Sequence, residues 1–167
     1  MQIISEWDAT QYFRTLTAQN KLAQQHGFDF VPVPSIAAAF ALAEARTKSV
    51  AHIAFCETSD GQMREGRSGG YFRHKVYTVF IMLRANIKSE ADKKAKLDIC
   101  RNVRDQFYSR LITEQYELEA ATSYIFQQSI QERDTPTFTL DGSVATFFQL
   151  EFDIPVDLRY DPEQWTT

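Results

Sequence analysis

The chain has 167 residues, of which 44% are hydrophobic and 24% charged, proportions that exclude a disordered or fibrous protein. This length fits one domain, and thirteen phenylalanines and seven tyrosines supply enough apolar surface for a core and for an interface. No window approaches the roughly 18 apolar residues of a membrane span, and residues 1–6 lack the features of a signal peptide, so we expect an intracellular protein.

The formal net charge of −4 is unevenly distributed, since residues 1–113 carry a net +5 and residues 114–167 a net −9. This polarity suits head-to-tail contact between copies or a partner of one sign, although folding can also interleave the two halves. Cys56 and Cys100 are the only cysteines and are widely separated, so we expect reduced, partly buried thiols rather than a disulfide or a redox pair.

Two helices joined by an extended segment are predicted at the start of the chain. Asp8 and Gln11 have the spacing of a capping box and begin a helix over residues 9–25. Residues 28–34 are expected to be extended, because the residue before a proline avoids helical backbone angles. Ser35 is placed to cap an alanine-rich helix that ends near residue 46, and its apolar composition predicts burial.

The middle of the chain predicts two strands around a glycine-rich loop. Residues 50–56 indicate a buried strand, and residues 57–70, with four glycines, a mobile loop. Residues 71–87 alternate aromatic or β-branched side chains with others, which indicates an unusually long strand. Residues 76–83 are expected in the core, and the basic beginning of the strand in a long β-hairpin arm over residues 57–75.

Ser89 and Asp92 predict the start of a long helix. Its packed face is expected to be a stripe of every fourth residue, and its solvated face to be basic; the stripe is Ala91, Ala95, Ile99, Val103, Phe107 and Leu111, and the basic residues are Lys93, Lys94, Lys96, Arg101, Arg104 and Arg110. Two more strands are predicted over residues 122–131 and 144–158.

The resulting order, ααββαββ, favours an α+β fold. We expect one domain over residues 1–167, with a mostly antiparallel four-stranded sheet and helices packed on one face. Residues 1–47 would form the N-terminal helices, residues 50–158 the strand–strand–helix–strand–strand core, and residues 159–167 an extended C-terminal tail that reaches a neighbour.

No motif for catalysis or ligand binding is found in the sequence. His26, His52 and His74 are isolated, so we predict no metal or cofactor site and a surface position for His74. The glycine-rich loop precedes a strand, whereas a phosphate-binding loop opens a helix. An enzyme of unfamiliar type is one alternative, and it would use His52, Glu57 and Asp60 near one strand end.

Nucleic-acid binding is an alternative for the arm, where basic and aromatic residues are interleaved: Arg64, Arg67, Tyr71, Phe72, Arg73, His74 and Lys75. The protein is acidic, however, with a pI near 5.4, whereas dedicated nucleic-acid-binding proteins concentrate positive charge. Specific DNA binding is therefore not expected.

Three segments between residues 50 and 158 follow one another in an order that is also found in a known family of proteins. They are a strand at residues 75–84 (KVYTVFIMLR), a helix containing Ala95, Ile99, Val103 and Asp105, and two long strands of which the second includes residues 147–154 (FFQLEFDI). The series resembles the tail-terminator and tail-completion (head–tail joining) proteins of tailed phages.

The resemblance implies a small α+β domain that assembles as a ring, typically a hexamer, where the tail tube of a phage or prophage meets the head connector. It implies no catalytic residue and no cofactor. The expected partners are other copies of the chain, tail-tube proteins and head-connector proteins, and no membrane; the expected locations are the host cytoplasm during assembly and the virion tail.

The arm, the sheet edges and the C-terminal tail would make the contacts, and the candidate contact residues are Arg64, Arg67, Tyr71, Arg73, Lys75, Tyr160 and Trp165. The alternative is a non-enzymatic adaptor or regulatory binding module that uses the basic arm on a protein or nucleic acid.

Overall fold

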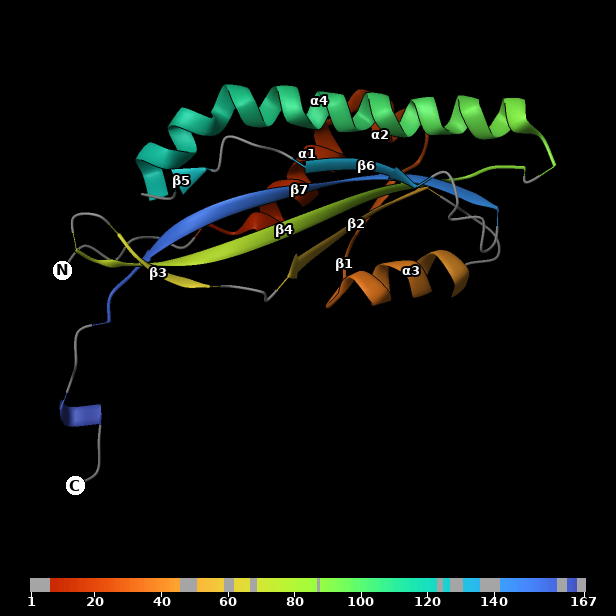
Figure 1. Cartoon of the computed structure of the whole chain (residues 1–167). Coiled ribbons are helices and arrows are strands. Elements are labelled where there is room, and N and C mark those ends of the chain that lie inside the picture. Colours follow the sequence, from red (N-terminus) through yellow and green to blue (C-terminus); the bar gives the residue numbers. More distant parts are fainter. Residues whose placement is uncertain are drawn as a thin grey trace.

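The computed structural model describes residues 7–45, 51–58, 62–66, 69–86, 88–122, 125–126, 131–135, 142–158 and 162–164. It confirms the α+β class, because one sheet lies between two layers of helices (Figure 1). Helices α1 (Ala9–Gln19), α2 (Lys21–Gln25) and α4 (Glu90–Thr122) cover one face of the sheet, called the first face below. Helix α3 (Ile36–Ala45) covers part of the second face, so the expectation that the helices pack on one face is wrong.

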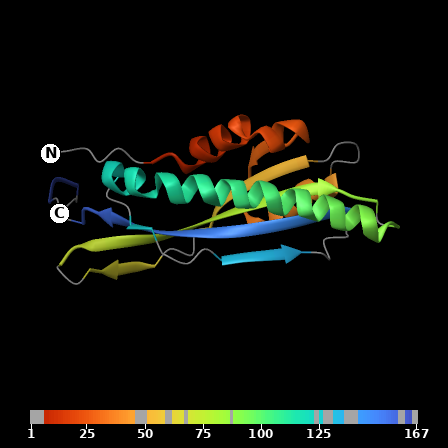
Figure 2. The same cartoon turned by 90° about the horizontal axis from the view of Figure 1, so that it is seen from above.

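The sheet is larger than expected and mixed. In the described part of the chain it has seven strands, with the main order β1 (Asp29–Pro32), β2 (Ala51–Thr58), β4 (Tyr71–Arg84), β7 (Ser143–Val156) and β5 (Ile125–Phe126). Strand β3 (Met63–Glu65) pairs with β4, and β6 (Gln131–Thr135) pairs with β7. Strand β1 is parallel to β2, while the other pairs are antiparallel. The long strands β4 and β7 cross in the view from above, because the sheet is strongly twisted (Figure 2).

The expected order of elements, ααββαββ, is correct only in outline. Strand β1 gives a weak sequence signal, because Pro32 fits an irregular extended segment equally well. Helices α1 and α2 are separate because Asn20 serves both: its N–H donates to the Leu16 carbonyl, and its side-chain oxygen accepts from Ala23 N at 2.8 Å. The strand predicted over residues 122–131 begins too early, since α4 continues to Thr122.

Three predicted helix caps are confirmed. The Asp8 carboxylate accepts from Gln11 N at 2.8 Å at the start of α1. The hydroxyl of Ser35 accepts from Ala38 N at 3.1 Å, and that of Ser89 accepts from Asp92 N at 3.2 Å. These bonds satisfy amide groups that have no partner within the first turn of a helix.

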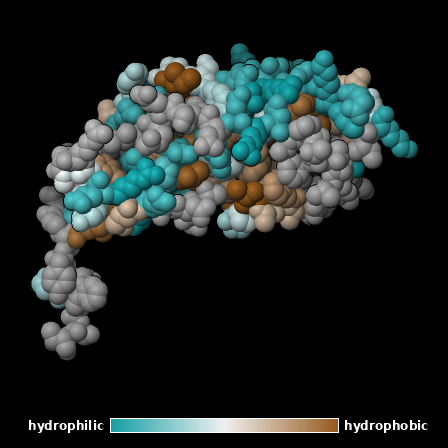
Figure 3. Space-filling view, viewed as in Figure 1, coloured by the Kyte–Doolittle hydropathy of each residue, from teal (hydrophilic) through white to brown (hydrophobic). Residues whose placement is uncertain are grey.

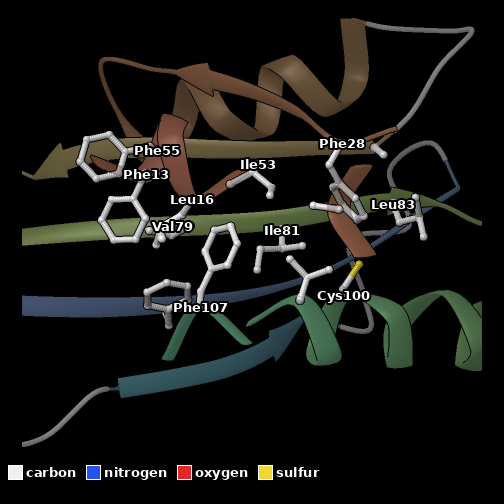
Figure 4. Close-up of a cluster of buried hydrophobic side chains, with 14 of the residues drawn as sticks. Phe13, Leu16, Phe28, Ile53, Phe55, Val79, Ile81, Leu83, Cys100 and Phe107 are labelled. Atoms are coloured by element: carbon white, nitrogen blue, oxygen red, sulfur yellow. The ribbon is translucent and has the colours of Figure 1, made fainter. Parts of the chain in front are cut away.

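The main core lies between the first face of the sheet and helices α1, α2 and α4. Phe13, Ile53, Ile81 and Phe107 meet there, and Figure 4 shows their side chains converging from both layers. A smaller core on the second face packs Ala39 of α3 against strand residues, which are Ala54, Cys56, Phe80, Met82 and Ala145. Strand β4 is therefore buried on both faces, which explains the unbroken run of buried side chains over residues 77–83.

Helix α4 packs along a different line from the predicted stripe. Ala91 and Ala95 are exposed. The buried positions with alternating spacings of three and four are Leu97, Cys100, Arg104, Phe107 and Leu111, and Val103 is buried beside them. A stripe of every fourth residue rotates by about 40° per step around the helix, so it cannot follow a straight line of contact over six positions. Of the helices in the described ranges, none is long and apolar enough to cross a membrane.

Candidate assembly surface

The start of β4, strand β3 and the end of β7 lie side by side at one end of the molecule, past the last turn of α4 (Figure 1). Tyr71 pairs with Glu65 of β3 and with Val156 of β7, and Arg73 pairs with Met63 and Ile154 in the same way. The expected two-stranded arm is therefore a three-stranded extension of the sheet. We call β3, residues 71–75 of β4 and residues 152–156 of β7 the strand end.

The turn between β3 and β4 is closed by glycines. Gly66 N–H donates to the Gly70 carbonyl at 2.8 Å, and Gly69 N–H donates to the Gly66 carbonyl at 3.1 Å. Gly69 and Gly70 have φ angles of 73° and 118°, which favour glycine. A Cβ atom on Gly66 would lie 2.7 Å from the Phe72 ring. The described part of the segment expected to be a mobile loop thus contains a short strand and a hydrogen-bonded turn.

Three predicted contact residues are exposed on the strand end, but on two different faces. Tyr71, 44% exposed, and Arg73 lie on the first face with the exposed Met63, because directly paired residues share a face. Arg64 is exposed on the second face, opposite Phe72. Arg67, Tyr160 and Trp165 lie outside the described residues.

Lys75, predicted as a contact, is instead bound within its own domain. Its Nζ lies 2.8 Å from Glu57 Oε1, and its side chain is only 18% exposed. Together with Trp7 and Tyr77, this pair lines a hollow of about 290 Å³ on the first face. The sequence alone could not show this ion pair, because it depends on the register that brings Glu57 of β2 opposite Tyr77, two residues from Lys75.

His74 is buried at the base of the strand end, contrary to the surface position expected. It is 7% exposed, with Nδ1 at 2.9 Å from Asp153 Oδ1 and Nε2 at 3.5 Å from Glu151 Oε2. Both carboxylates come from β7, the neighbouring strand, and His74 N–H donates to the Gln62 carbonyl at 2.9 Å. These contacts attach β4 to its neighbours at the point where the strand end begins.

Arg104 is also buried, although it was assigned to the solvated face of its helix. It is 9% exposed, its Nη1 donates to Thr146 Oγ1 at 3.1 Å, and it lies 3.5 Å from carboxylate oxygens of Glu132 and Asp134 on β6. Arg101 donates to Asp134 at 2.6 Å, and this hydrogen bond is the main reason that the pKa of Asp134 lies below its usual value. The two arginines therefore tie the edge strand β6 to α4.

Helix α4 is about 50 Å long and carries charge of opposite sign at its two ends. Lys88, which precedes the helix, and Lys93, Lys94 and Lys96 lie at one end of the molecule, with Glu90 and Asp92 among them. Residues 111–122 contain Glu114, Glu117 and Glu119 and no basic residue, and they end beside the strand end (Figure 1). Acidic side chains are unfavourable at a helix C-terminus, so helix stability does not account for this acidic end.

The residues of the enzymatic alternative are not brought together. His52 faces the second core with Ala54 and Cys56, whereas Glu57 lies on the opposite face of β2, and Asp60 is outside the described residues. Among the described residues there is no group of His, Cys, Asp or Glu that could hold a metal ion.

The two thiols are buried on opposite sides of the sheet, Cys100 in the main core and Cys56 in the second. Both are free, as expected. Burial raises the pKa of Cys100 to about 12 and also raises that of Cys56, so both are protonated at neutral pH and poor nucleophiles.

No protein-family model matches this chain, and no curated protein matches it.

Proposed function

We propose that this chain is a structural subunit of a phage or prophage tail. It is a tail-terminator or neck protein whose copies form a ring, a hexamer as is typical of the resembled family, and this ring caps the tail tube and joins it to the head connector. The resemblance in the order of elements supports this assignment. The fold contains the long strand β4, the helix α4 after it and the long strand β7 on which that resemblance depends.

The observation that carries the proposal is the difference between the two ends of the elongated domain. One end combines the exposed Tyr71 and Arg73 with the acidic last turns of α4, and the other carries the lysines at the start of α4. A contact between two different surfaces of the same chain is heterologous. Repeated heterologous contacts form a closed ring when the rotations from one copy to the next add up to a full turn. The opposite charges favour such contacts between copies.

The sheet edges provide a second kind of contact. Within the described residues, β1 pairs only with β2, and β6 pairs only with β7, so each leaves an outer edge without a strand partner. An unpaired edge can add a strand from a neighbour. Arg133 is exposed on β6 and favours a partner strand that carries an acidic side chain.

The proposal is tested by sedimentation velocity of the purified chain and of Lys94→Glu, which reverses an exposed charge at the lysine end of α4. We expect the wild-type chain to form one discrete oligomer and Lys94→Glu to shift it towards monomer, because the acidic end of the neighbouring copy then meets a negative charge. Lys21→Glu makes the same charge change on the exposed surface of α2 and should assemble normally. A wild-type chain that stays monomeric at high concentration would refute the ring, and binding of DNA with steep salt dependence would favour the adaptor alternative.

A further inference from the structure

The second face of the sheet contains a groove that the fold leaves open. It lies between α3 and strands β4, β6 and β7, has a volume of about 240 Å³, and is lined by Ile36, Phe40, Phe80, Arg133, Phe147 and Gln149. This hollow and the six residues that line it are called the groove below. Figure 3 shows apolar surface gathered along the lower middle of the molecule, where α3 begins.

The composition of the groove indicates what it can hold. Four of its six residues are apolar, and three of these are aromatic: Phe40, Phe80 and Phe147. The Phe80 ring packs against Phe40 at 5.5 Å and against Phe147 at 5.2 Å between centroids, so the aromatic lining is continuous. Arg133 is exposed and is the charged member. Such a surface suits a flat aromatic side chain with a carboxylate beside it.

We propose that the groove receives the C-terminal segment of a neighbouring copy, residues 157–167, with Trp165 as the anchor in the aromatic lining. This inference rests on the proposed assembly of copies into a ring, and it names the contact that joins them.

The chemistry of the segment matches the groove. It contains two aromatic residues, Tyr160 and Trp165, and its acidic residues Asp157, Asp161 and Glu163 outnumber its single basic residue. Glu163 lies two residues before Trp165, which allows a carboxylate to approach Arg133 when the indole is seated. The negative segment thus meets a groove whose charged residue is positive.

The position of the segment explains why the groove belongs to a different copy. The segment leaves β7 at the strand end, and its short helix η1 (Pro162–Gln164) lies clear of the sheet and helices (Figure 1). From Val156 back to the level of the groove, between Phe147 and Gln149, is about 26 Å along β7.

From Val156 to Trp165 the chain spans at most about 26 Å, because three of the nine residues rise only about 2 Å each in η1. A return to its own groove would therefore need nearly the whole segment to run straight back along the sheet, whereas the groove of a neighbouring copy does not require this path.

Disulfide formation between two chains tests this contact directly. One chain carries Gln149→Cys in the groove and the other carries Thr166→Cys next to Trp165, and the two are mixed under mild oxidation. The native thiols, Cys56 and Cys100, are buried and do not interfere. We expect a covalent dimer in the mixture and little in either chain alone. In a chain that carries both changes we expect a ladder of covalent oligomers, whereas a cross-linked monomer would show that the segment docks on its own domain and would overturn the inference.

The anchor is tested by substitution in sedimentation velocity. Trp165→Ala should weaken association at least about tenfold, as expected for an aromatic anchor, while Trp165→Phe should retain most of it. If the wild-type chain forms a ring, Trp165→Ala forms the same ring, and no mixed cross-link appears, the inference fails while the ring stands. A wild-type chain that never associates and never cross-links removes the ring as well.

Discussion

Truncation of Phe107 to alanine is the most direct test of how α4 packs. The side chain is 1% exposed in the main core, where its ring lies 6.4 Å from that of Phe13. Removal of a fully buried phenylalanine ring costs about 3–5 kcal/mol, from lost transfer free energy and from the cavity that remains. For a chain of this size, that loss lowers the melting temperature by roughly 6–20 °C.

Urea unfolding followed by circular dichroism measures this loss, at a concentration low enough that assembly does not contribute. Ile112→Ala is the matched control, because Ile112 is 60% exposed on the same helix, and its change should stay within about 0.5 kcal/mol. A loss below about 1 kcal/mol for Phe107→Ala, with an unchanged denaturant dependence, would show that α4 presents another face to the sheet.

Three further outcomes are expected. Arg104→Met keeps an apolar stem but removes the donor to Thr146, and it should cost about 1.5–3 kcal/mol in the same assay, whereas a neutral result would mean that Arg104 does not hold β6. The lowered pKa of Asp134 makes a contribution to stability that is complete above about pH 4 and is lost as the pH falls through the folded-state pKa. From pH 5 to pH 2 the melting temperature should therefore fall more steeply for the wild type than for Asp134→Asn, and an equal fall in both would contradict this. Cys56 and Cys100 should react slowly with a thiol reagent in the native chain and rapidly in urea, and fast native labelling of Cys100 would contradict its burial.

The long-range arrangement of the fold is harder to predict from the sequence than its local elements. The alternation in β4 and β7 and the caps of α1, α3 and α4 are local patterns, and the sequence predicts them well. The position of α3 on the second face depends on which side of the sheet the chain crosses after β1, and no local pattern records that choice. The apolar composition of α3 suggested full burial, but Ala37 and Ala41 are exposed because the helix packs with one side only.

The residues of the candidate surface show the same difference between what local patterns predict and what depends on long-range pairing. The interleaving of basic and aromatic residues in the sequence marks Tyr71, Arg73 and Arg64 as candidate contact residues, and all three are exposed. It could not place His74 and Lys75, since their partners Asp153 and Glu57 come from neighbouring strands and depend on register.

The groove was missed for a related reason. The alternation of β7 that places Phe148 in the main core also places Phe147 and Gln149 on the opposite face. Only the position of α3 shows that a hollow remains beside them.

The central claim is that copies of this chain close into a ring, and imaging of the purified chain tests it most directly. Negative-stain electron microscopy, combined with native mass spectrometry of the same sample, gives both the shape and the number of subunits. We expect closed rings of one size, with a mass equal to a whole number of chains and consistent with a hexamer. A monomer at every concentration, or open filaments of unlimited length, would contradict it.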